Sequence, residues 1–133
     1  MDDMVAEWVK YSDMDLKTAK HLHENMRPMP LEIICYLCQQ SAEKALKAFL
    51  IFSGIKPEKT HDLGFLGNKC TDVDNSFSEI EESCSRLNRY SSQPRYPFEI
   101  EITDGDALLA LQSGSKISEF VKRKYSDVQE DLI

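Results

Sequence analysis

The sequence carries little positive charge, has no long apolar run and lacks the common catalytic motifs. Its formal net charge is -7 at pH 7. This charge does not favour sequence-independent binding to a nucleic-acid backbone, because such binding comes mainly from the neutralisation of phosphates by Lys and Arg. The acidic excess lies mainly in residues 61–133, so a local basic patch in the first half of the chain remains open. No apolar run is long enough to span a bilayer, and we expect no transmembrane helix.

Motifs that cradle phosphate, activate a serine or hold a metal are also missing. The sequence has no Gly-rich phosphate loop, no Gly-x-Ser-x-Gly turn and no His-Glu-x-x-His pair. Its first residues are acidic and lack the basic start and the apolar stretch of a signal peptide. We therefore expect a cytoplasmic location.

The four cysteines do not have the spacing of a metal site. Cys35 and Cys38 form a Cys-x-x-Cys pair inside an expected helix, whereas Cys70 and Cys84 lie far away at irregular spacing. A zinc site usually takes two compact ligand pairs, and a thioredoxin-type redox site needs a βαβ context that this sequence does not show. We predict reduced, buried thiols, no metal and no cofactor.

The length and composition are those of a globular domain. The chain has 133 residues, of which 41% are hydrophobic and 29% charged, enough to bury one core. We expect a single domain over residues 1–126 and a tail over residues 127–133.

The strongest helical pattern runs from Leu31 to Gly54. Small and apolar residues recur there in steps of four and three, which places them on the core side of one helix: Ile34, Cys38, Ser41, Ala45, Ala48 and Phe52. Gly54, followed by Pro57, is a signal for the end of a helix. We expect the other helices to pack around this one.

Capping residues and prolines mark the other helices. Asp2 or Asp3 begins a first helix, which the prolines of residues 27–30 end. Thr60 is the predicted N-cap of a short third helix. Capping boxes begin a fourth and a last helix, formed by Ser76 with Glu79 and by Thr103 with Asp106. The last helix has its apolar side at Leu108, Leu111, Ser115, Val121 and Tyr125.

The predicted fold class is all-α. We expect an antiparallel helical bundle of about five helices, with a four-helix up-and-down core and one short helix. Residues 91–97 interrupt it as a shaped loop, because Pro94 and Pro97 disfavour helix at the residues before them. Residues 98–102 alternate like a strand, but without a partner strand they are predicted to be an extended connector.

A polar stripe follows one face of the helix over residues 31–54 and consists of Gln40, Glu43, Lys44 and Lys47. One interpretation is a solvated face with i,i+4 pairs and no chemistry. The other is a groove in which the lysines meet an anionic ligand, such as a nucleotide phosphate, and Glu43 fixes Arg95. His61 is either a general acid or base, or a histidine packed beside a helix start. Both alternatives remain open from the residues alone.

Three separated motifs resemble those of the HEPN (higher eukaryotes and prokaryotes nucleotide-binding) domain family. They are Gln39–Lys47, read as QQSAEKALK, Lys59–Leu63, read as KTHDL, and Arg95–Pro97, read as RYP, preceded by Trp8 in an amphipathic first helix. The resemblance covers the chain from Trp8 to about Tyr125. It implies a compact helical bundle, typically a homodimer, often found with a minimal nucleotidyltransferase in pairs that act as toxin and antitoxin.

One known activity of the family does not carry over. Many members are metal-independent ribonucleases that use an Arg followed a few residues later by a His. None of four arginines of this sequence has a His at that spacing, namely Arg27, Arg86, Arg89 and Arg95. The resemblance therefore implies a non-catalytic module that binds nucleotide or RNA, or docks a nucleotidyltransferase. Its groove would be formed by Gln40, Glu43, Lys44, Lys47, Lys59, His61, Arg95 and Tyr96.

Two further possibilities remain. The chain is alternatively a metal-independent ribonuclease, in which His61 supplies acid–base chemistry and Arg95 stabilises the transition state. In the other possibility the motifs have a purely structural role, and a buried pair of Glu43 and Arg95 ties the loop to the bundle. Tyr96 offers its ring to a base, or plugs the end of the bundle.

Overall fold

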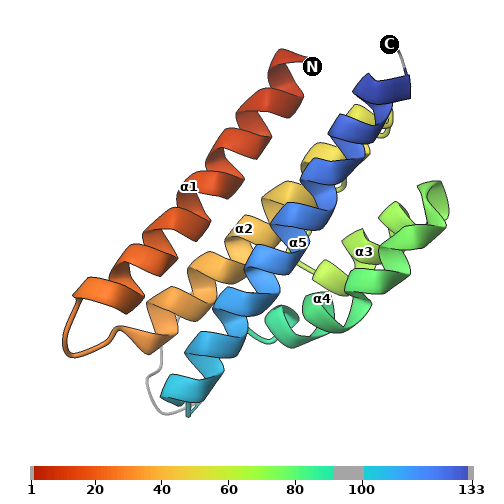
Figure 1. Ribbon diagram of the computed structural model, residues 1–133. Coiled ribbons are helices and arrows are strands. Elements are labelled where there is room, and N and C mark those ends of the chain that lie inside the picture. Colours follow the sequence, from red (N-terminus) through yellow and green to blue (C-terminus); the bar gives the residue numbers. More distant parts are fainter. Residues whose placement is uncertain (1, 92–100, 132–133) are drawn as a thin grey trace.

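Three long helices lie side by side and form the body of the molecule (Figure 1). A computed structural model describes residues 2–91 and 101–131, in which the long helices are α1 (Asp3–Asn25), α2 (Leu31–Phe52) and α5 (Asp104–Asp131). α1 runs opposite to α2, whereas α5 runs in the same direction as α2 (Figure 1). α2 contacts both of the other long helices and is the central one.

Shorter helices pack on one side of this body. They are α3 (Leu63–Val73), the 3-10 helix η1 (Asn75–Ile80) and α4 (Glu81–Asn88), and α3 and α4 both contact α2. The described ranges contain helices and no strands, so the predicted all-α bundle of about five helices is confirmed. No helix within these ranges combines the length and the apolar character needed to cross a membrane.

The end of α2 follows the glycine signal. Gly54 has a φ of 79°, and its N–H donates to the carbonyl of Ile51 at 3.0 Å. The next N–H, that of Ile55, donates to the carbonyl of Leu50 at 2.9 Å. This pair of bonds is a Schellman motif, which requires the left-handed conformation that glycine adopts without strain. The helix therefore ends where the sequence predicts.

One predicted capping box is present and the other is not. Thr103 and Asp106 exchange backbone-to-side-chain bonds of 2.9 and 3.1 Å at the start of α5, as expected. The pair of Ser76 and Glu79 does not cap a helix in this way. Asp74 accepts instead from the N–H and the hydroxyl of Ser76, at 3.0 and 2.7 Å, and begins η1. A carboxylate two residues earlier is the stronger acceptor, so it takes the cap.

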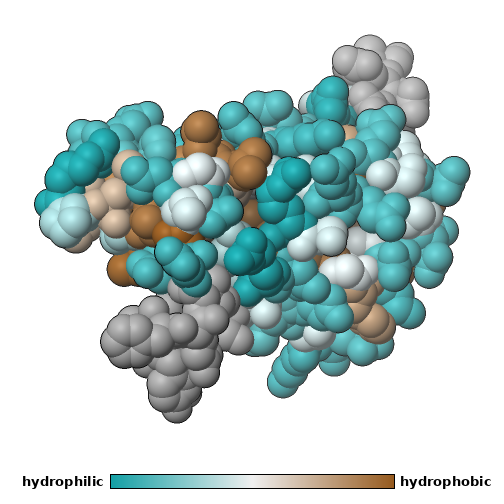
Figure 2. Space-filling model, turned by 90° about the horizontal axis from the view of Figure 1, so that it is seen from below, coloured by the Kyte–Doolittle hydropathy of each residue, from teal (hydrophilic) through white to brown (hydrophobic). Residues whose placement is uncertain are grey.

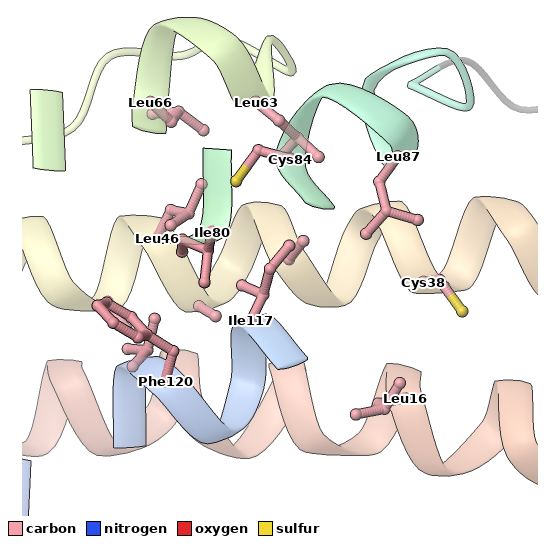
Figure 3. Close-up of a cluster of buried hydrophobic side chains, with 14 of the residues drawn as sticks. Leu16, Cys38, Leu46, Leu63, Leu66, Ile80, Cys84, Leu87, Ile117 and Phe120 are labelled. Carbon is pink, nitrogen blue, oxygen red and sulfur yellow. The ribbon is translucent and has the colours of Figure 1, made fainter. Parts of the chain in front are cut away.

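The core lies where the shorter helices meet α2 and α5. Figure 3 shows Leu46 of α2, Leu66 of α3, Cys84 of α4 and Phe120 of α5 turned towards one cluster. The expected core side of α2 is confirmed: Ile34, Cys38, Ser41, Ala45 and Ala48 are buried, and Phe52 packs at the margin.

The predicted apolar side of α5 is partly wrong. Leu108 is 48% exposed, whereas Ala107 and Ala110 are fully buried. These alanines let α5 lie close to its neighbours, and at Gly114 an added Cβ would stand only 3.2 Å from Leu16. Small residues rather than leucines thus set the rotation of α5. The helix also continues to Asp131, past the expected end near residue 126.

One end of the bundle carries apolar surface. Figure 2, the view from below, shows apolar side chains grouped within an otherwise hydrophilic face. The large exposed apolar residues of the α1–α2 connection and of the first two turns of α2 and α5 are Met26, Ile33, Leu108 and Leu109. Single exposed apolar residues are ordinary, and we assign no partner to this end.

Candidate functional site

Two charged residues of α2 are buried. Glu43 is 4% exposed and Lys47 is 8% exposed, and the Lys47 Nζ lies 3.1 Å from the Glu43 Oε2. The interpretation of this stripe as a solvated face is therefore wrong for these two residues. A buried charge is costly unless it is paired and hydrogen-bonded, and here each ion is the partner of the other.

His61 is the second partner of Glu43. The His61 Nδ1 lies 2.9 Å from the Glu43 Oε1, while 71% of the histidine side chain is exposed. A carboxylate only accepts hydrogen bonds, so Nδ1 must carry a proton, in the neutral ring or in the imidazolium, and the Nε2 edge is left for solvent or a ligand. His61 therefore combines a fixed ring orientation with an open ring edge.

Gln39 attaches the backbone beside this histidine to α2. Its amide is fully buried and donates to the carbonyl of His61 at 3.1 Å and to the Glu43 Oε1 at 3.4 Å. The Gln39 carbonyl oxygen accepts from the Gln40 side chain at 2.7 Å. We call the five residues Gln39, Gln40, Glu43, Lys47 and His61 the polar site.

The turn that carries His61 is fixed from its other end as well. Asp62, and not Thr60, is the N-cap of α3, because its Oδ1 accepts from the N–H groups of Gly64 and Phe65 at 2.9 and 3.2 Å. Thr60 accepts from the Asp62 N–H at 3.1 Å and so shapes the turn before the helix. The Asn88 amide of α4 also donates to Asp62, at 3.1 Å. The turn is thereby tied to both α2 and α4.

The other predicted cations of the site differ in their surroundings. Lys44 forms an ion pair with Asp15 of α1, and Lys47 is paired with Glu43. Both ammonium groups on α2 therefore already have carboxylate partners, rather than standing open for an anion. Lys59 is exposed on the turn before His61. Positive charge for a ligand is available on that turn more than on the helix.

An aromatic ring borders the polar site on the α1 side. The Lys47 Nζ lies 5.8 Å from the centroid of the Trp8 ring, within the range of a cation–π contact. Trp8 is half-buried and packs against the core. The sequence motifs indicated Trp8 as part of the helix pattern but not of the site. Gln39 was likewise missed, although its i,i+4 spacing from Glu43 is visible in the sequence.

Two predicted site residues cannot be placed. Arg95 and Tyr96 lie in residues 92–100, outside the described part of the chain. The predicted pair of Glu43 with Arg95 therefore stays a prediction. The contacts of Glu43 that the structure describes are those to Lys47, Gln39 and His61.

The cysteines are buried free thiols, as predicted. Burial raises the pKa of Cys35 to about 11 and that of Cys38 to about 12, because removal from water disfavours the thiolate. The pKa values of Cys70 and Cys84 are raised to about 12 for the same reason. Within the described residues no three His, Cys, Asp or Glu side chains gather as a metal site would require.

The comparisons with known proteins bear on the family and the fold of the chain. A family model of the HEPN domain matches residues 5–124. The crystal structure of an archaeal HEPN homologue is 27% identical, with a TM-score of 0.71, over 90% of this chain and 96% of that chain. A crystal structure from Thermus thermophilus is 23% identical, with a TM-score of 0.75, over 92% of this chain and 99% of that chain, and this likeness shows the fold alone. The comparison with curated proteins found no match.

Proposed function

The chain belongs to the HEPN domain family, and from this premise we propose that it is a non-catalytic nucleotide-binding module whose ligand meets the polar site. One observation carries the proposal, namely that an exposed imidazole is held by a buried carboxylate. The Glu43 side chain fixes the His61 ring at 2.9 Å, yet most of that ring remains open. A pre-oriented donor or acceptor binds a ligand with little loss of conformational freedom.

Charge on the turn supports an anionic ligand. Lys59 and His61 both lie on the exposed turn before α3, and we propose that Arg95 joins them. The proposal extends to the biological setting that the resemblance implies. The chain would be a cytoplasmic homodimer that partners a minimal nucleotidyltransferase in a toxin–antitoxin-like pair, with docking of that partner as the module's second role.

A thermal-shift screen tests the proposal. Wild type, His61→Ala and the matched control His21→Ala would be melted with nucleotides and with short RNA. A ligand at a hundredfold excess over its Kd stabilises the native state by about 2.7 kcal/mol, a shift that is easily measured. We expect stabilisation by nucleotide in wild type and in His21→Ala, and its loss in His61→Ala. Absence of any shift with every ligand would contradict the proposal.

The same geometry favours a second candidate, a metal-independent ribonuclease. A histidine whose Nδ1 is held by a carboxylate is arranged to exchange a proton at Nε2, and Arg95 would stabilise the charge of the transition state. This candidate predicts RNA cleavage that survives a chelator and disappears in both His61→Ala and Arg95→Ala. Binding without cleavage would favour the non-catalytic module.

A further inference from the structure

Trp8 is connected to the polar site through contacts that run from α1 across α2 to the turn before α3. Its ring lies 5.8 Å from the Lys47 Nζ, and that ammonium lies 3.1 Å from the Glu43 Oε2. The other carboxylate oxygen of Glu43 lies 2.9 Å from the His61 Nδ1. An aromatic ring and an imidazole therefore stand at opposite ends of one continuous set of contacts.

The Trp8 ring is not required to neutralise the charge of Lys47. Lys47 is already buried and paired with Glu43, so its charge is satisfied without the ring. Trp8 nevertheless keeps part of its surface open, although the core cluster holds the rest. A rigid, partly exposed indole beside a polar site offers a flat apolar surface at small entropic cost, which suits a planar ligand.

The cations favour a phosphate at the other end of the site. Lys44 and Lys47 are paired with carboxylates of this chain, whereas Lys59 and the open edge of His61 face solvent on the turn. A ligand with a flat apolar part for Trp8 and an anionic part for the turn suits this pairing of an aromatic ring with exposed polar groups. A nucleoside monophosphate has these two parts joined by a sugar.

We propose that Trp8, which borders the polar site, contacts the base, and that the ligand is a nucleoside monophosphate whose phosphate meets His61 and Lys59. This inference rests on the proposed function, since it names the ligand class and a binding residue of that same site. Aromatic stacking tolerates any base, so the site would select for the presence of a base rather than for its identity.

Trp8 also reports on the test, because it is the single tryptophan of the chain. Adenosine monophosphate and ribose 5-phosphate would be titrated into the full chain, followed by calorimetry and by tryptophan fluorescence. The two probes share sugar and phosphate and differ in the base. Trp8→Leu removes the ring and Trp8→Phe keeps an aromatic surface. Tyr11→Leu is the matched control, since Tyr11 is an exposed aromatic on the same helix.

We expect adenosine monophosphate to quench the fluorescence and to bind at least tenfold more tightly than ribose 5-phosphate. Trp8→Leu should lower the affinity for adenosine monophosphate to that of ribose 5-phosphate. Trp8→Phe should restore most of it, and Tyr11→Leu should leave it unchanged.

Two other outcomes overturn the inference in different ways. Binding of adenosine monophosphate without quenching, and with equal affinity in wild type and Trp8→Leu, would exclude a base contact by Trp8 but leave the proposed function standing. Equal affinity for the two probes has the same meaning. No binding of either probe to wild type would remove both the inference and the nucleotide-binding function on which it rests.

Discussion

The residue that holds the site together is Glu43. It sits between Lys47, the Gln39 amide and the His61 ring, and it is almost completely buried. Removing one partner of a buried ion pair leaves the other charge without compensation, which costs far more than the net contribution of the pair. The site therefore depends on this carboxylate for stability as well as for the orientation of His61.

Replacement of Glu43 measures this dependence. We expect Glu43→Ala to lower the free energy of unfolding by about 3 kcal/mol, because Lys47 stays buried without its partner. The double variant Glu43→Ala with Lys47→Met should recover part of the loss, as urea denaturation would show. Glu82→Ala is the control, since the pair of Glu82 with Arg86 is exposed and should change stability by less than about 1 kcal/mol. Equal losses in the two single variants would contradict the burial of the pair.

The buried thiols give a second prediction for single residues. Burial raises the pKa of the Cys38, Cys70 and Cys84 thiols to about 12, so the reactive thiolate is scarce at neutral pH. A thiol reagent at pH 8 should label native protein slowly and denatured protein quickly, and mass spectrometry would count the modified cysteines. Fast labelling of all four in the native state would mean that the core does not protect them.

The turn before α3 is the element that presents His61. From the sequence, either Thr60 or Asp62 could cap α3, but in the structure Asp62 is the cap and Thr60 shapes the turn before it. Asp62→Ala should lower the free energy of unfolding by about 1 kcal/mol, because two N–H groups and the Asn88 amide lose their acceptor. Thr60→Ala, which loses one bond in the turn, should cost less. Equal or reversed losses in chemical denaturation would contradict the assignment of the cap.

The Asp74 carboxylate at the start of η1 should make the stability of the protein depend on pH. Hydrogen bonds from the Ser76 hydroxyl and from Lys124 lower the pKa of Asp74 below its ordinary value. The carboxylate therefore contributes stability above about pH 4, and this contribution is lost as the pH falls through the lowered native pKa. Asp74→Asn should be less stable than wild type at pH 7, and the difference should shrink as the pH is lowered from 4. Urea denaturation over that range measures it, and a difference that grows on acidification would have the wrong sign.

Sequence periodicity predicted the elements well and their contacts less well. The spacing of Ile34, Cys38, Ser41, Ala45 and Ala48 predicted the buried side of α2, because one helical period decides it. The same reasoning left open whether Glu43 and Lys47 lie in solvent or in a groove. Their burial depends on a turn eighteen residues later in the chain from Glu43 and on a ring from α1, and no local pattern carries that information. The prediction of the buried side of α5 was partly wrong for a related reason, since close packing of the helices buries Ala107 instead of Leu108.

At the scale of the whole molecule, the bundle brings three distant segments together. α1 supplies Trp8, α2 supplies Gln39, Glu43 and Lys47, and the turn before α3 supplies His61. Belonging to the HEPN family accounts for this scaffold, but family and fold alone do not decide the function. The proposed function depends on the open edge of His61.

The most direct measurement is the NMR spectrum of the three histidine rings during titration with adenosine monophosphate. His21 and His23 of α1 serve as internal controls, and the signals that are missing from the spectrum of His61→Ala are those of His61. The account predicts that the His61 resonances shift in a saturable manner while those of His21 and His23 stay in place. Static His61 resonances, or equal shifts of all three rings, would contradict a nucleotide site at His61.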